Sequence, residues 1–159
     1  CYVGSDGEKF YQYTMLEEAS RKRFIYAYKE NSSHSTIDFV QRAIIFFGYA
    51  PETIQTDHGG EFTHTQKTNR IHPFDMLCNK LHITHKVLRP RTPWHNGKVE
   101  RSHRNDQERF YNHLSFYSYD DLQVQMKRYL YRSNNIPMSV LGWKTPNQKQ
   151  YELENIIYI

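Results

Sequence analysis

The sequence predicts an α/β domain in which helices cover the faces of a mixed β-sheet. Strand-like segments alternate along the chain with segments that carry a helical apolar stripe, an order typical of this architecture. The 159 residues suit a single hydrophobic core. Aromatic residues make up 15% of the chain, including 13 tyrosines and 9 phenylalanines, which favours a packed domain although the mean hydropathy is −0.85. We therefore expect one domain over residues 1–159.

The first third of the chain predicts two antiparallel strands and a helix. Residues 9–15 (KFYQYTM) alternate aromatic and polar side chains, and residues 23–28 (RFIYAY) are rich in β-formers. Ser35 followed by Asp38 is a capping-box pattern, and Gly48 is the expected helix stop. The apolar stripe between them consists of Ile37, Val40, Ile44 and Phe47.

The middle of the chain predicts two further strands and two helices. Short strands are expected at residues 53–56 and 85–88, and a helix at residues 73–81 lies between them. A long polar helix over residues 97–114 follows. Ligand-binding residues of such sheets gather at strand ends and at adjoining helix starts, so these positions are the first candidates for a site.

The last forty residues predict one more helix and then irregular chain. Ser118 is expected to cap the helix. Its apolar stripe consists of Leu122, Met126, Tyr129 and Leu130. Residues 133–147 are interpreted as extended connections and turns.

Charge and cysteine content limit the classes of partner and compartment. The 21 basic and 17 acidic residues give a net charge of +4 and a pI near 9.0, which permits a polyanionic partner. Cys1 and Cys78 are too few for a disulfide framework, which favours a reducing compartment. No apolar run approaches the roughly 20 residues of a membrane helix. We expect no membrane partner and a cytoplasmic location.

Two loop segments carry the candidate chemistry. Residues 56–62 (TDHGGEF) place Asp57 directly after a predicted strand, and residues 93–101 (PWHNGKVER) open a helix with Glu100 in its first turn. Each has an explanation without function, because Asp and Gly are common in turns and a first-turn glutamate stabilises a helix by roughly 0.3–1 kcal/mol. Two carboxylates about 4 Å apart would repel by roughly 4 kcal/mol at an effective dielectric of 20, so their convergence would require a cation. Oxygen ligands suit Mg²⁺ or Mn²⁺.

Together these motifs resemble the integrase catalytic core of D,D,E transposases, nearest to those of bacterial insertion sequences and more distantly to retroviral integrases. The resemblance extends over nearly the whole chain, including the order of strands and helices. It implies an RNase H-like fold, two divalent metal ions (Mg²⁺ or Mn²⁺), and the cutting and joining of DNA strands in integration and recombination. It also implies that the partners are DNA at element ends and targets, that the protein forms homo-oligomers, and that it associates with a bacterial nucleoid.

The resemblance carries over to individual acidic residues. Asp57 matches the family's second metal ligand and Glu100 its third, so both are candidate catalytic and metal-binding residues. The 43 positions from one to the other exceed the family's usual spacing, and residues 63–72 can take up the excess as a loop. His58 stands where the family usually has asparagine. The family's first aspartate lies in a strand upstream of the position of Cys1, so we expect a truncated first strand and a core that alone cuts DNA poorly.

A basic helix face is the candidate DNA-binding surface. Rotation by 100° per residue places His103, Arg104 and Gln107 on the side of the helix that carries Glu100. The full set of candidate DNA-binding residues is Lys98, Arg101, His103, Arg104, Gln107, Arg89, Arg91, His95 and Asn96. These groups could hold the phosphate backbone without reading sequence. A solvated basic face without a ligand is the alternative interpretation.

Three other interpretations stay open at this stage. The chain could be a non-catalytic DNA-binding or oligomerisation module of a decayed mobile element, or an RNase H-like nuclease without strand transfer. Cys78, His82 and His85 have a spacing that superficially resembles zinc ligands, but no fourth ligand stands at a standard distance along the chain. Cys78 is better explained as a small buried apolar residue.

Overall fold

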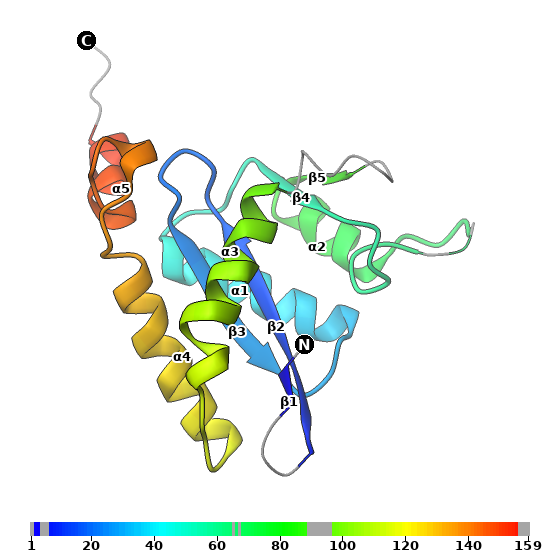
Figure 1. Cartoon of the computed structure of the whole chain (residues 1–159). Coiled ribbons are helices and arrows are strands. Elements are labelled where there is room, and N and C mark those ends of the chain that lie inside the picture. The colour runs from blue at the N-terminus through cyan, green and yellow to red at the C-terminus, as the bar shows by residue number, and fades with distance from the viewer. Residues whose placement is uncertain (1, 4–6, 65, 67, 89–96, 156–159) are drawn as a thin grey trace.

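The computed structural model describes residues 2–3, 7–64, 66, 68–88 and 97–155, which form an α/β domain with two small sheets (Figure 1). The first sheet is antiparallel, with the order β1 (Tyr2–Val3), β2 (Lys9–Leu16) and β3 (Arg23–Tyr28). The second sheet is a parallel pair of β4 (Thr53–Thr56) and β5 (Thr84–Val87). The predicted class is therefore confirmed, and both parallel and antiparallel pairing occur.

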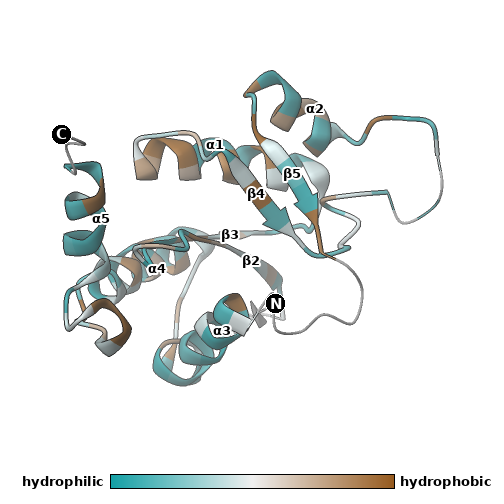
Figure 2. Ribbon diagram, turned by 90° about the horizontal axis from the view of Figure 1, so that it is seen from above, coloured by the Kyte–Doolittle hydropathy of each residue, from teal (hydrophilic) through white to brown (hydrophobic). Residues whose placement is uncertain are grey.

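Helices cover both faces of the first sheet. The helices of the described chain are α1 (Ser33–Phe47), α2 (Pro73–Lys80), α3 (Gly97–Arg109), α4 (Tyr119–Ser133) and α5 (Pro146–Glu154), with short 3-10 helices η2 (Tyr111–His113) and η3 (Ser139–Leu141). Figure 2 shows α1 on one side of β2 and β3, and α3 and α4 on the other side. The second sheet lies across a groove from β2, and α1 contacts α2 as well as β2 and β3.

Strand β2 shows why the alternating sequence pattern predicts this layering. Successive side chains of a strand point to opposite faces. Tyr13 packs against Phe39 of α1 at a ring distance of 5.5 Å. The neighbouring Gln12 points the other way and donates a hydrogen bond of 2.8 Å to Asp106 of α3. The polar positions of β2 therefore face the helix that carries Glu100.

The ends of α1 show one correct prediction and one error. Gly48 ends the helix with a φ of 84°, a conformation that glycine adopts without strain. The N-cap is Ser32 and not Ser35, because the Ser32 hydroxyl accepts from the Ser35 N–H at 3.2 Å. The Ser35 hydroxyl instead donates to the carbonyl of Glu30 at 3.1 Å. Two serines three residues apart both fit the capping pattern, and the first of them begins the helix.

The C-terminal third differs most from the prediction. The long polar helix ends at Arg109, and η2 follows it. The segment predicted as connections contains η3 and leads into α5. Thr145 and Gln148 form a complete capping box at the start of α5, and Pro146 follows the N-cap in the first turn. Helix α5 buries only Pro146 and Gln150, so it has no apolar stripe that a periodicity search could detect. The capping box of Thr145 and Gln148 was the sequence signal that could have predicted the start of α5.

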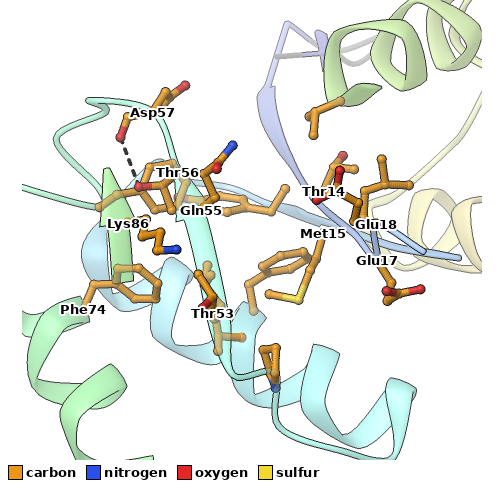
Figure 3. Close-up of a pocket in the computed structure, with 18 of the residues that line it drawn as sticks. Thr14, Met15, Glu17, Glu18, Thr53, Gln55, Thr56, Asp57, Phe74 and Lys86 are labelled. Atoms are coloured by element: carbon orange, nitrogen blue, oxygen red, sulfur yellow. Dashed lines mark hydrogen bonds between the residues drawn. The ribbon is translucent and has the colours of Figure 1, made fainter. Parts of the chain in front are cut away.

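The two sheets are separated by a groove and are not joined by strand pairing among the described residues, whereas the sequence predicted one mixed sheet. β1 has only two residues and pairs with β2 at Phe10 and Lys9, so the rest of that edge of β2 faces the groove. The groove has a volume of about 1020 Å³ and is lined by β2, β4, α1 and the start of α3. Figure 3 shows Thr14 and Met15 of β2 across this groove from β4.

Helix α3 is attached to the first sheet through polar side chains. Its only buried residues are Ser102 and Asp106. The Arg23 guanidinium of β3 lies 2.5 Å from one Asp106 oxygen and donates to the Ser102 hydroxyl at 2.6 Å. Gln12 and the Tyr129 hydroxyl donate to the same carboxylate at 2.8 and 2.9 Å. Three side chains outside α3 therefore fix the rotation of the helix about its axis through four polar contacts.

We predict that Asp106→Ala lowers the free energy of unfolding by about 3–5 kcal/mol, because it leaves the buried Arg23 guanidinium without its anionic partner. Urea denaturation measures this change. Glu108→Ala, at an exposed position of the same helix, is the matched control and should change stability by less than about 0.5 kcal/mol. Equal losses in both variants would show that the buried pair does not hold the helix.

Candidate active site

Asp57 lies where the chain leaves the second sheet. Ile54 and Thr56 are the buried positions of β4, and the next residue, Asp57, is exposed at its carboxyl end. The Gly59 N–H donates to Asp57 Oδ1 at 3.0 Å, a local turn that orients the carboxylate. Asp57 is among the residues that line the groove, as Figure 3 shows. The predicted second acidic residue is thus at a strand end and accessible.

The loop after Asp57 brings a second carboxylate to the groove. Glu61 also lines the groove. A Cβ atom at Gly59 would come within 2.6 Å of the Glu61 carboxyl group, so the glycine leaves room for that side chain. Phe62 holds the loop to the core through ring contacts with Tyr13 and Phe74. Glu61 belongs to the TDHGGEF motif, but the sequence analysis gave it no role.

His72 fastens this loop to two helices. Its Nδ1 accepts from the Phe74 N–H at 3.2 Å and so caps α2. Nδ1 therefore carries no hydrogen, and Nε2 holds the ring hydrogen of the neutral imidazole. Nε2 lies 3.2 Å from both the Ser33 hydroxyl and the Gly60 carbonyl. The buried ring thus links α1, α2 and the loop that follows Asp57.

Glu100 lies in the first turn of α3 and is exposed. Its neighbours Lys98, Val99 and His103 line the groove, whereas Glu100 is not among the lining residues. The structure therefore brings the first turn of α3 to the same groove as Asp57 and Glu61. It does not bring the Glu100 carboxylate itself to the groove wall.

Two of the predicted DNA-binding residues contact β2 or the turn that follows it. Lys98 forms an ion pair with Glu18, and this contact lowers the pKa of the Glu18 carboxyl group. His103 lies 3.2 Å from the Thr14 hydroxyl. The pKa of His103 is lowered, first because the surrounding protein disfavours the charged imidazolium. The lowered pKa makes His103 a weaker source of positive charge on this face than the arginines.

The remaining predicted DNA-binding residues differ in their environment. Arg101 and Arg104 are exposed and form no ion pair with any residue that the structure describes. Gln107 donates to the Asn112 side chain at 2.8 Å. Arg89, Arg91, His95 and Asn96 lie outside the described residues.

The donor chemistry fits a hard divalent cation, although the set of ligands is incomplete. Asp57, Glu61 and Glu100 offer carboxylate oxygens, the ligands that Mg²⁺ and Mn²⁺ prefer. Among the residues with described coordinates, no three acidic, histidine or cysteine side chains are grouped closely enough to hold one ion. Asp57 and Glu100 are thus candidate ligands whose convergence the structure does not display.

The alternative zinc ligands are dispersed. Cys78 is 1% exposed in the core, as predicted, and burial raises its pKa to about 11. His82 is exposed, while His85 points into the protein and bonds to Thr56 and Asp75. These three side chains therefore do not form a metal site.

The chain belongs to the integrase core domain family. One family model described as integrase core domain matches residues 1–93, and a second with the same description matches residues 81–146. The two matches include both motifs that carry the candidate site.

Two curated relatives are 29% identical to the chain. An ORF3 protein of Spiroplasma virus SpV1-C74, named as an integrase, aligns over 136 residues, which are 80% of this chain and 38% of that protein. The retrovirus-related Pol polyprotein from transposon TNT 1-94 of Nicotiana tabacum aligns over 104 residues, 64% of this chain and 7% of the polyprotein. The chain thus spans well under half the length of either relative.

Solved structures of similar shape come from retroviruses. The HTLV-2 integrase catalytic core domain in complex with magnesium superimposes with a TM-score of 0.71 and 21% identity, covering 94% of this chain and 90% of that one. The catalytic core domain of BIV integrase gives 0.67 and 21%, with coverages of 90% and 86%. A chain of the simian T-cell lymphotropic virus intasome gives 0.70 and 22%, with coverages of 89% and 48%. The predicted RNase H-like fold is confirmed, and the nearness to bacterial insertion-sequence transposases stays a prediction.

None of the helices that the structure describes combines the length and apolar character of a membrane-crossing segment.

Proposed function

We propose that this chain is the catalytic core of a DNA integrase or transposase that cleaves and joins DNA strands with divalent metal ions. The observation that carries the proposal is the position of Asp57. In a chain of the integrase core family, it stands exposed at a strand end, on a groove that the first turn of the Glu100 helix also lines. A metal ligand needs this accessible carboxylate on a rigid element.

Asp57 and Glu100 would hold the metal ions, with Mg²⁺ or Mn²⁺ suited to their oxygen ligands. When bound, a pair of such ions activates the attacking water or 3′ hydroxyl and stabilises the leaving oxygen. The chain's own contribution is to orient the carboxylates. The Gly59 N–H fixes Asp57, and the Arg23–Asp106 contact fixes the helix of Glu100.

The exposed guanidinium groups of Arg101 and Arg104 would bind the DNA backbone. They stand on the helix that carries Glu100, and phosphate contacts position a duplex without reading its sequence. Lys98 can join them only if it leaves Glu18, because the two side chains form an ion pair. We also propose that the protein acts as a homo-oligomer, in agreement with the dimeric and trimeric forms of the HTLV-2 core. We propose the cytoplasm as its location.

We predict that Mn²⁺ broadens NMR signals around Asp57 and Glu100 selectively, and that Asp57→Asn or Glu100→Gln weakens this effect by removing a charged ligand. Glu108→Gln, an exposed glutamate further along the same helix, is the control and should leave the broadening unchanged.

In a longer protein that contains this core, both ligand variants should abolish strand transfer while DNA binding persists. Full strand transfer by either variant would contradict the assigned roles.

We predict that Arg104→Glu weakens DNA binding and reduces the slope of log affinity against log salt by about 1, because one phosphate contact is lost. Fluorescence anisotropy over a series of salt concentrations measures both quantities. Arg128→Glu makes the same charge change at an exposed position of α4 and is the matched control. An unchanged slope for Arg104→Glu would favour a solvated face without DNA.

One observation favours a second candidate function, a DNA-binding or oligomerisation module without catalysis. Asp57 and Glu61 share the groove, but Glu100 is not among its lining residues.

We propose that strand cleavage needs a further carboxylate beside Asp57 and Glu100. The 159-residue chain alone should then nick supercoiled DNA poorly in Mg²⁺. Robust nicking that Asp57→Asn abolishes would reject this proposal, and binding of DNA without any metal effect at Asp57 would favour the module.

A further inference from the structure

A hydrogen-bonded chain of three side chains ends at the backbone of Asp57. Asp75 of α2 lies 2.6 Å from His85 Nδ1, and His85 Nε2 lies 2.8 Å from the Thr56 hydroxyl. The Thr56 hydroxyl lies 3.1 Å from the carbonyl oxygen of Asp57 and donates to it (Figure 3). We infer that His85 is a positioning residue, which acts through Thr56 to hold Asp57 in place. This inference rests on the proposed role of Asp57 as a metal ligand.

The inner two members of this chain of contacts are buried, whereas the Asp75 side chain is 38% exposed. The His85 side chain is 6% exposed, and Thr56 is buried. The ring of Phe74, which is itself fully buried, stands edge-on to the His85 imidazole at 4.7 Å. Packing therefore restricts the His85 ring to an orientation in which each nitrogen faces one partner. Hydrogen bonds shielded from water in this way are stronger than exposed ones.

The hydrogens on these groups determine whether the contact to Asp57 exists. A hydroxyl has one hydrogen, so Thr56 can donate to the Asp57 carbonyl only if it accepts a hydrogen bond from His85. Nε2 must then carry a hydrogen, while Nδ1 faces the Asp75 carboxylate on the other side of the ring. If Nε2 lacked its hydrogen, the Thr56 hydroxyl would turn toward the ring. Asp75 and His85 therefore control the donor that reaches Asp57.

Asp57 is consequently held at two points. The Thr56 hydroxyl bonds to its backbone carbonyl, and the Gly59 N–H bonds to its carboxylate. The Thr56 carbonyl is also fixed, because it accepts from the Leu88 N–H at 2.8 Å. Groups that orient a metal ligand from behind commonly change metal affinity by about 10-fold or more when they are removed. His85 has this relation to Asp57 without touching the groove residue itself.

The test compares Thr56→Val, which removes the hydroxyl and keeps a similar shape, with Thr56→Ser, which keeps the hydroxyl. We expect Thr56→Val to shift the backbone ¹³C carbonyl resonance of Asp57 and to lower the apparent Mn²⁺ affinity about 10-fold. Thr56→Ser should restore both readouts. Thr84→Val, at an exposed threonine of β5, is the matched control and should change neither. A purely structural role of Thr56 would lower stability without the selective shift at Asp57.

His85→Gln and His85→Asn provide a second pair of variants. Gln can place its amide N–H near the former Nε2 position and should retain the Asp57 resonance, whereas Asn is too short and should shift it as Thr56→Val does. An unchanged Asp57 resonance and Mn²⁺ affinity in Thr56→Val would overturn the inference. Absence of Mn²⁺ effects near Asp57 in the wild-type chain would instead count against the proposed function, and the carbonyl resonance would still decide whether the contact chain holds Asp57.

Discussion

The buried contact between Arg23 and Asp106 is the interaction on which the candidate site depends most. Helix α3 buries only Ser102 and Asp106, and the Arg23 guanidinium contacts both. Hydrogen bonds to a charged group require a defined distance and angle. The orientation of Glu100 is thus determined by directional bonds to the first sheet.

The strands and the first helix could be predicted from local sequence. β3 and β4 have the predicted bounds, and α1 ends at the predicted Gly48. These elements have a strong period of side-chain burial or a terminating glycine, both of which are local signals. Helix α5 has no apolar period, and the separation of the two sheets depends on contacts between distant parts of the chain. Local patterns contain no information of that kind.

The sequence indicates candidate residues for the site but not the side chains that surround them. Asp57 and Glu100 stand out because the two motifs resemble a known family, and their exposure agrees with a ligand role. The partners that fix them are far along the chain, since Asp106 meets Arg23 and Thr56 meets His85. In β5 the neighbours of His85 are exposed while His85 is partly buried. A polar residue at an inward-facing strand position was the sequence signal that could have pointed to His85. Its role emerges only when the strands are paired.

The separation of the two sheets has a consequence for how the domain opens. α2 packs on α1, and its Phe74 contacts Phe62, whose ring also contacts Tyr13 of β2. No strand pairing joins β4 to β2 in the described chain. Parts of a protein that share few backbone hydrogen bonds can unfold separately as distinct cooperative units. Amide hydrogen exchange should therefore show two cooperative units, with α1 at the boundary between them. Asp57 and the start of α3 line the groove between these units, so local opening of either unit would widen the groove.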